Sequence, residues 1–316
     1  MPDPTPHDLA QSPPTSRDSI RFDTSLLEPR LLEALDAVVD GGGFERAAAR
    51  LHVTQSAVSQ RIRLLEDRLG RPVLVRATPP RPTELGRRLL RHVRRLRLLE
   101  DDLRAELDRD APSPRLPIGV NADSLATWVL PALLPLALEH GWLLDLRVQD
   151  QERTHALLRA GEVAGCVSTR PEPMQGCRVA RLGRMDYPCT CTPAFRRRWF
   201  PHGLTPEAAA LAPAVLYNRD DGLHDRFLAR EFGPDGVPDY PRHYVPSSEG
   251  FVALVTAGAA YGLTPQLQVR EALARGGLVD LAPGRPMPVE LHWHTWNLDS
   301  AALAQVSAAL QAADLA

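Results

Sequence analysis

The chain has 316 residues, enough for about two domains, and its 44% hydrophobic and 24% charged residues are sufficient for an ordinary globular core. No apolar run reaches the roughly eighteen residues of a membrane span, and the proline- and acid-rich start lacks the features of a secretory signal. These properties disfavour membrane and secreted classes, so we expect a cytoplasmic protein with no membrane partner.

The net charge of −2 conceals a basic N-terminal segment. Between Phe44 and Arg97 fourteen arginines stand against four acids, so this segment carries +10 and the remainder −12. A basic segment on an otherwise acidic chain indicates one polyanion-binding part. A solvated basic helix face is the alternative when charge alone is considered.

The first predicted elements are a tail and a helix. Residues 1–25 are rich in proline and serine and show no buried pattern, so we expect a disordered tail. From Leu26 an amphipathic helix follows, with apolar residues at spacings of three and four, and it ends at the glycines of positions 41–43.

A helix-turn-helix is predicted next, in the segment FERAAARLHVTQSAVSQRIRLLEDRLG from Phe44 to Gly70. Two short apolar-periodic helices flank HVTQ, a connection too short for a linker, and alanines allow the helices to cross closely. The second helix of such a pair enters the DNA major groove, where forked donors and acceptors read base edges. An ordinary helical hairpin is the alternative, but the turn, the basic charge and a following TPPRPT wing coincide.

The candidate DNA-contacting residues have two expected roles within a DNA-binding domain of residues 26–82. Side chains at the start of the second helix read bases, and arginines around it and the wing neutralise phosphates. The predicted base-reading residues are Gln55, Ser56, Ser59, Gln60 and Arg63. The predicted phosphate contacts are Arg61, Arg76, Arg81, Arg87 and Arg88, and Thr54 and Pro80 complete the predicted DNA-binding surface.

A long helix is predicted after the wing, within a linker of residues 83–110. Its apolar positions recur at spacings of four and three, interrupted once by an acid, and these positions are Leu89, Val93, Leu96, Glu100, Leu103 and Leu107. This heptad-like seam favours dimerisation, with packing on the first helix of the same chain as the alternative. The segment DAPSPR, residues 110–115, then breaks the helix as a hinge.

The remaining residues, 111–316, alternate between strand and helix patterns. This alternation predicts parallel sheets with right-handed crossovers, and hence an α/β fold. We expect two α/β subdomains, one of about residues 116–184 plus the C-terminal segment and one of about residues 185–285. A ligand cleft between two such halves is the natural site.

Several segments resemble one known family. FERAAARLHVTQSAVSQRIRLLEDRLGRPVLVRATPPRPTELG is similar to the winged helix-turn-helix of LysR-type transcriptional regulators. VLVRATPPRPTE, VNADSLATW, GEVAGCVS and SSEGFVAL resemble the regulators of arginine and lysine export within that family. The resemblance extends over essentially everything after the tail, although the proline-rich extension before Leu26 departs from it.

The resemblance implies a fold, partners and a function. The fold is an N-terminal winged helix-turn-helix, a long linker helix, and a C-terminal effector domain of two subdomains like a type 2 periplasmic binding protein. The partners are double-stranded DNA with an inverted-repeat operator, a second copy in a homodimer or homotetramer, and RNA polymerase. The function is control of a basic amino-acid exporter gene, as an activator or a repressor, with lysine or arginine as effector and no cofactor.

The candidate effector-binding residues lie at strand ends and helix starts of this implied fold. Hydroxyls and helix N-termini suit the carboxylate of an amino acid, and carboxylates suit its cations. The predicted set is Asn121, Asp123, Ser124, Thr127, Ser168, Asp186, Asp221, Ser247, Ser248 and Glu249. We expect Ser124 and Ser248 to hold the carboxylate, and Asp123 with Asp186 or Asp221 to receive cations. Helix capping and solvated loops are the alternatives for these residues.

Metal binding and catalysis have little support in the sequence. His292 and His294 alternate on one strand without a completing ligand, and Cys189 and Cys191 have no second pair, so we expect no metal site and reduced thiols. The motifs of nucleophilic catalysis and phosphate binding are missing, so we expect no enzyme. A LysR-type regulator with another small-molecule effector and a solute-binding protein are the alternative functions.

Overall fold

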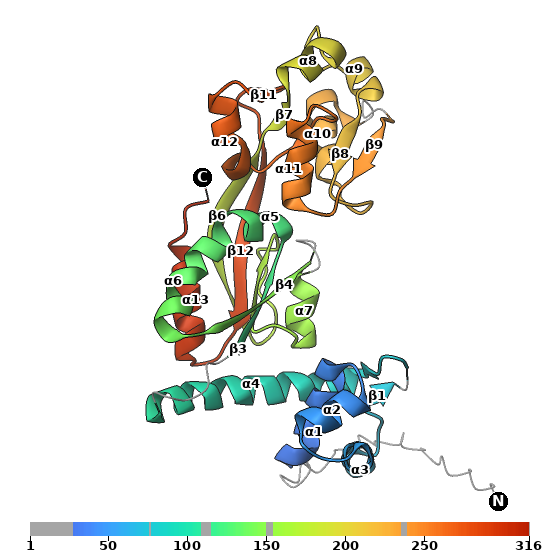
Figure 1. Cartoon of the computed structure of the whole chain (residues 1–316), viewed down its shortest axis with the longest axis vertical. Coiled ribbons are helices and arrows are strands. Elements are labelled where there is room, and N and C mark those ends of the chain that lie inside the picture. Colours follow the sequence, from blue (N-terminus) through green and yellow to red (C-terminus); the bar gives the residue numbers. More distant parts are fainter. Residues whose placement is uncertain (1–27, 76, 109–114, 150–153, 235–238, 316) are drawn as a thin grey trace, which may run out of the picture. The chain divides into compact units, whose positions relative to one another are not determined.

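The computed structural model describes residues 28–75, 77–108, 115–149, 154–234 and 239–315 (Figure 1). The chain divides into two compact units, residues 1–86 and residues 87–316. The tail predicted for residues 1–25, the DNA-contact candidate Arg76 and most of the predicted hinge lie outside the described residues.

The first unit contains the three predicted helices. They are α1 (Pro29–Gly41), α2 (Phe44–Arg50) and α3 (Gln55–Leu69). Proline at the first position suits the start of α1, and Gly42 ends it with a left-handed φ of 64° that glycine adopts without strain. The three helices bury one apolar face each, formed by Leu31, Leu32, Leu35, Val38, Ala47, Ala48, Val58, Ile62 and Leu65. The predicted helix-turn-helix is therefore confirmed.

A two-stranded wing follows α3. The antiparallel strands are β1 (Leu74–Val75) and β2 (Arg81–Pro82). The carboxylate of Glu66 on α3 accepts hydrogen bonds from the backbone N–H groups of Val73 at 2.9 Å and Leu74 at 3.3 Å. This side chain fixes the start of the wing against α3.

The long helix α4 (Glu84–Leu107) is present as predicted. From residue 87 onward it belongs to the second unit, where its arginines bind backbone carbonyl groups. Arg91 donates to the carbonyl oxygen of Arg159 at 2.6 Å, and Arg94 donates to that of Gly161 at 2.8 Å. Part of the surface of α4 is therefore occupied by contacts within its own chain.

The first half of the second unit is a five-stranded sheet with helices on both faces. In Figure 1, α6 and α13 lie on one side of this sheet and α7 on the other. The strand order is β4-β3-β5-β12-β6. Its elements are β3 (Arg115–Val120), α5 (Ala122–Ser124), the π-helical turn η2 (Leu125–Val129), α6 (Leu130–His140), β4 (Leu143–Val148), α7 (Thr154–Ala160), β5 (Gly165–Ser168), β6 (Cys177–Tyr187), β12 (Met287–Trp296) and α13 (Ala301–Gln311).

The second half contains two smaller sheets. One is three-stranded with the order β10-β7-β11, and the other pairs β8 with β9 in parallel. Its elements are β7 (Cys189–Cys191), α8 (Pro193–Trp199), α9 (Pro206–Leu211), β8 (Ala214–Leu216), α10 (Leu223–Phe232), β9 (Arg242–Tyr244), α11 (Ser248–Thr256), β10 (Gly262–Leu263), α12 (Gln266–Ala274) and β11 (Val279–Asp280).

The α/β class is confirmed, but the prediction of purely parallel sheets is wrong. β3 pairs in parallel with β4 and β5, whereas β12 runs antiparallel to both β5 and β6. β12 returns from the second half, so it enters the sheet from the opposite end. The two long antiparallel strands β6 and β12 connect the halves, and helices α8 and α9 were not predicted.

The apolar run at the start of the first half is a core helix of this fold. Residues Ala122–His140 form the one continuous helical stretch, among those described, that is long and apolar enough to cross a membrane. However, Trp128, Val129 and Leu133 on this stretch are buried in the same apolar core as β3 and β5. Part of its hydrophobicity is therefore explained by packing, whereas Leu130, Leu134 and Leu138 of the same stretch are exposed.

Candidate functional site

A groove in the first unit brings three of the five predicted base-reading residues together with the wing. Its volume is about 770 Å³. Gln55, Ser59 and Arg63 line it from α3, at spacings of four residues that place them on one helix face, and Pro80 lines it from the wing. An α-helix that presents a polar face of amide, hydroxyl and guanidinium groups has the chemistry needed to read base edges.

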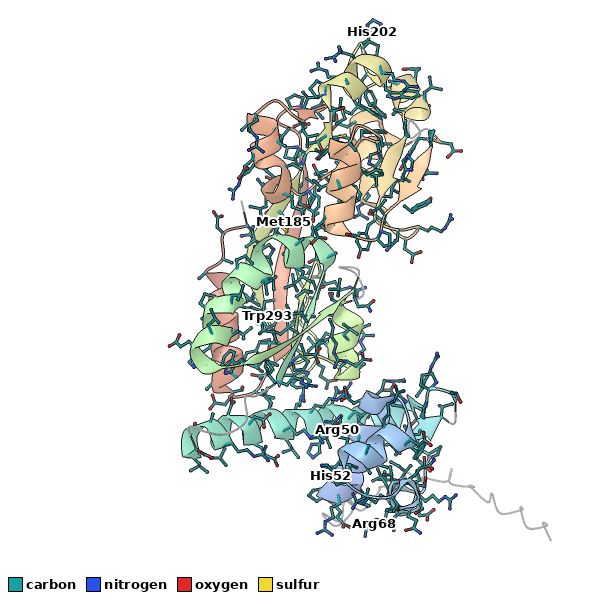
Figure 2. The ribbon with its side chains drawn as sticks, viewed as in Figure 1. Arg50, His52, Arg68, Met185, His202 and Trp293 are labelled. Atoms are coloured by element: carbon teal, nitrogen blue, oxygen red, sulfur yellow. The ribbon has the colours of Figure 1, made fainter. Side chains whose placement is uncertain are left out.

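The turn before α3 uses the predicted DNA contact Thr54 as a helix cap. Thr54 is the N-cap: its hydroxyl oxygen accepts a hydrogen bond from the N–H of Ala57 at 3.2 Å and lies 2.9 Å from the hydroxyl of Ser56. Between the two helices, His52, which is labelled in Figure 2, adopts a positive φ of 53°. The capping bond fixes the first turn of α3, which carries Gln55.

The remaining predicted DNA contacts lie outside the groove lining. Gln60 is exposed and Arg61 half-buried on α3, and Arg81 is exposed on β2. Exposed cations next to a polar helix suit phosphate contacts, which orient a protein on DNA without reading its sequence.

A second candidate site is a narrow cleft between the two halves of the second unit. Its volume is about 60 Å³. The first half contributes the end of β3 and the start of α5, and the second half contributes the loop after β8 and the helices α10 and α11. The lining residues are Asn121, Ala122, Asp123, Gln149, Tyr187, Tyr217, Asp221, Leu223, Phe251, Leu263 and Pro265.

Asp123 holds the central position in this cleft. One of its carboxylate oxygens accepts a hydrogen bond from the hydroxyl of Ser248 at 2.6 Å, and the other accepts from the phenol of Tyr187 at 2.9 Å. Burial raises the pKa of Asp123, the two hydroxyl bonds lower it, and the Asp221 and Glu249 carboxylates raise it again. An incoming cation would favour the ionised carboxylate.

Asp221 supplies a second carboxylate. It accepts hydrogen bonds from the backbone N–H groups of Tyr217 at 3.0 Å and Leu223 at 3.0 Å, one on each oxygen. These two bonds fix the loop between β8 and α10 and aim the carboxylate at the cleft, where it lies close enough to Asp123 to raise the pKa of that group.

Two buried amide oxygens near the cleft are further hydrogen-bond acceptors. Within the described residues, Oδ1 of Asn121 and Oε1 of Gln268 have no hydrogen-bond partner. A buried acceptor without a donor is costly, so both atoms favour a ligand that brings N–H groups. No arginine or histidine is among the described residues that line the cleft, and the chain has no lysine.

Other predicted effector residues point elsewhere. The Ser124 hydroxyl is buried and donates to the sulfur of Met185 at 3.8 Å, a residue of β6 that is labelled in Figure 2. Thr127 donates to the carbonyl of Asp123 at 2.6 Å within its own helix. Asp186 forms an ion pair with Arg184 at 3.0 Å.

The other three predicted residues cap or brace the backbone. Ser168 is buried and accepts from the N–H of Arg170 at 3.2 Å. Ser247 is the N-cap of α11, accepting from the N–H of Gly250 at 3.1 Å, and its hydroxyl lies 3.3 Å from the exposed Glu249. None of these three lines the cleft.

The sequence reasoning missed several cleft residues. The acids Asp186 and Asp221 were predicted, yet the nearby tyrosines Tyr187 and Tyr217, which line the cleft, were not. A signal for Tyr187 existed in its position next to Asp186 and in the alternation of side chains along β6. Gln149 and Gln268 carried no comparable signal. Among the described residues, no group of three or more His, Cys, Asp and Glu is arranged to hold a metal ion.

Two family models match the chain. The model described as the bacterial regulatory helix-turn-helix protein of the lysR family matches residues 29–87. The model of the LysR substrate binding domain matches residues 109–314. The first match contains the groove formed by α3 and the wing, and the second contains the cleft around Asp123.

Individual relatives extend the similarity over nearly the whole chain. The transcriptional regulator ArgP of Aeromonas salmonicida is 48% identical over 285 residues, 89% of this chain and 94% of the relative. A crystal structure of ArgP from Mycobacterium tuberculosis is 40% identical with a TM-score of 0.80, covering 90% of this chain and 97% of that one. Full-length LysG from Corynebacterium glutamicum with bound effector Arg is 34% identical with a TM-score of 0.73, at the same coverage.

Proposed function

Because the chain belongs to the LysR family of transcriptional regulators, and to its ArgP branch, we propose that it takes lysine or arginine as effector in the cleft around Asp123. It binds DNA through its helix-turn-helix and is a regulator, not an enzyme. The proposed regulator works in the cytoplasm and controls, by activation or repression, a gene for basic amino-acid export.

The chemistry of the cleft carries the effector proposal. Its lining carries two carboxylates, Asp123 and Asp221, and the unpartnered amide oxygen of Asn121 beside uncharged tyrosine and glutamine side chains, with no cationic side chain in the described lining. A ligand that brings an ammonium and a guanidinium or second ammonium satisfies such a site, and an anionic ligand would meet like charges. The LysG relative, with arginine bound, supports the same ligand class.

A ligand panel tests this proposal against a regulator with another effector. Arginine and lysine are added to the purified full-length protein and its melting temperature is followed, with citrulline and norleucine as neutral analogues of similar shape. A bound effector at a hundredfold excess over its Kd stabilises the protein by about 2.7 kcal/mol. Stabilisation by the cationic amino acids alone supports the proposal. An equal response to citrulline, or no response to either cation, overturns it.

An Asp123→Asn variant provides the matched control. The amide keeps the shape of the side chain but removes the charge, so the stabilisation by arginine should be lost while the operator is still bound. Footprinting on upstream DNA then measures whether arginine or lysine changes the protected region. An unchanged footprint with both amino acids contradicts their role as effectors.

Self-association through α4 is part of the proposal. Exposed leucines follow each other along this helix at spacings of three and four: Leu96, Leu99, Leu103 and Leu107. An apolar row of this kind on a long helix supports a homodimer, and hence an operator of two inverted half-sites. The predicted seam members Leu89 and Val93 are buried within the single chain.

A second exposed apolar row supports the proposed homotetramer. It lies on α6 and consists of Leu130, Leu134 and Leu138, four residues apart. Sedimentation of the wild type and of a Leu103→Glu variant tests the assembly. The variant should sediment as a smaller species than the wild type, and identical sedimentation would contradict pairing through α4. RNA polymerase is the remaining proposed partner, reached from the operator-bound protein.

A further inference from the structure

A chain of hydrogen bonds leads from α12 through α11 to the centre of the cleft. The side-chain amide of Gln268 donates to the hydroxyl oxygen of Ser248 at 3.1 Å. The Ser248 hydroxyl in turn donates to Asp123 at 2.6 Å. Since a serine hydroxyl has a single proton, the bond from Gln268 leaves that proton directed at the carboxylate. Ser248 is 2% exposed, so this bond is protected from water.

This chain of bonds joins the two halves at the point where a cationic ligand would bind. Asp123 lies on α5 of the first half, and Ser248 and Gln268 lie on helices of the second half. The space left in the cleft is about 60 Å³. Pockets for small molecules have volumes of about 300 Å³ or more. The halves must therefore separate before an amino acid enters, and the bond between Asp123 and Ser248 must then break.

We propose that the Ser248 hydroxyl, positioned by Gln268, is an internal latch that substitutes for the effector's cation at Asp123 and holds the ligand-free cleft closed. A cationic effector must displace this hydroxyl in order to bind. The identity of the effector rests on the function proposed above, whereas the latch itself concerns the ligand-free protein.

The geometry distinguishes the latch from an ordinary helix cap. The neighbouring Ser247 caps α11, because it accepts from the backbone N–H of Gly250. Ser248 makes no such bond and instead reaches across the cleft to Asp123. The second donor to this carboxylate, Tyr187, belongs to the strand β6 that connects the halves, so its bond does not by itself close the cleft.

Hydrogen exchange of the ligand-free full-length protein tests the latch directly. The Ser248→Ala variant removes the bond, and Gln268→Met removes the group that positions it at similar side-chain size. A hydrogen bond to a charged group corresponds to a change of about tenfold or more in an equilibrium. We therefore expect the amides of α5 and of the first turn of α11 to exchange about tenfold faster in Ser248→Ala, and by a smaller factor in Gln268→Met.

Two further variants serve as controls. Thr256→Ala removes a hydroxyl on the same helix that donates to the carbonyl of Val252, within that helix, at 2.8 Å, so exchange at the cleft should match the wild type. Ser248→Thr keeps the hydroxyl and should restore slow exchange. Unchanged exchange in Ser248→Ala, or equally fast exchange in Thr256→Ala, overturns the latch. If Ser248→Ala fails to fold, Gln268→Met decides the result by the same criterion.

Rapid-mixing kinetics with arginine separate a latch from a ligand contact. Loss of a latch increases the association rate constant, which we expect to rise about tenfold in Ser248→Ala and to return in Ser248→Thr. Loss of a mere ligand contact increases the dissociation rate constant and leaves association unchanged, and that result overturns the proposal. If the wild type binds neither arginine nor lysine, the proposed effector fails, while the exchange experiment still decides the latch.

Discussion

A buried histidine in the second half makes the stability of the protein sensitive to acid. His224 on α10 is 2% exposed, and neither of its ring nitrogens has a hydrogen-bond partner within the described residues. Its ring contacts aromatic side chains, with centroids 5.2 Å from Tyr240 and 5.0 Å from Tyr261. Burial lowers the pKa of His224 from 6.5 to about 4, opposed by the charge of Asp225 and assisted by that of Arg242.

The sign and size of the effect follow from proton linkage. Between pH 6.5 and about 4 the unfolded chain binds a proton at His224 and the folded chain does not, so acid favours unfolding. The contribution of His224 to stability is complete above pH 6.5 and is lost as the pH falls towards 4. One unit of pKa corresponds to about 1.4 kcal/mol, so the loss between pH 7.5 and pH 5.0 is about 2 kcal/mol.

Urea unfolding of the wild type and of His224→Phe measures this loss. Phenylalanine fills the aromatic cluster without a titrating group, and no hydrogen bond is lost. All five tryptophans lie between residues 128 and 296, so their fluorescence reports the second unit alone. The free energy of unfolding should fall from pH 7.5 to pH 5.0 by about 2 kcal/mol more in the wild type than in the variant. Equal losses in the two proteins would refute the assignment.

Three further predictions concern the first unit, residues 1–86, which is called the head below, and the cleft around Asp123. In Gly86→Ala the new Cβ would lie 2.1 Å from the carbonyl oxygen of Val73, so we expect a loss of about 1–3 kcal/mol or more in head stability, measured by circular dichroism. Thr54→Ala removes the cap on Ala57 and should cost about 1 kcal/mol in the same assay, whereas Thr54→Ser should not. The raised pKa of Asp123 predicts that arginine affinity, measured by calorimetry, is constant at high pH and begins to fall at a pH above 3.8, where Asp123 becomes protonated and binding of the cation must release that proton. This proton release should be absent in Asp123→Asn.

The head was predictable because its signals are local. The spacing of apolar residues, the glycines at positions 41–43 and the short turn each specify structure within a few residues of themselves. The wing followed from its prolines. The bond from Glu66 to the start of the wing was not predictable, because an acid on a helix surface looks the same in sequence whether or not a strand lies beside it.

The second unit was predictable in its elements more than in their pairing. Alternating patterns located β3, β4 and β5 and the helices between them, but they carry no information on strand direction. β12 joins the first sheet after the chain has passed through the whole second half, and its antiparallel pairing with β6 depends on that long-range return. Helices α8, with three arginines in succession, and α9, with six residues, lack the apolar periodicity that revealed the longer helices.

The side chains that face the cleft were the least predictable feature of the sequence. A strand end followed by a helix start identified Asn121 and Asp123 together with Ser124, yet successive residues on a helix point about 100° apart, so only some face the cleft. The same rotation separates Ser247, which caps its helix, from Ser248, which reaches the opposite half. The sequence placed both serines in the effector set and assigned Ser248 to a carboxylate, but it gave no sign of the bond to Asp123. They differ because Ser248 lies at the contact between the two halves and Ser247 does not. An effector must change this same contact in order to alter the protein.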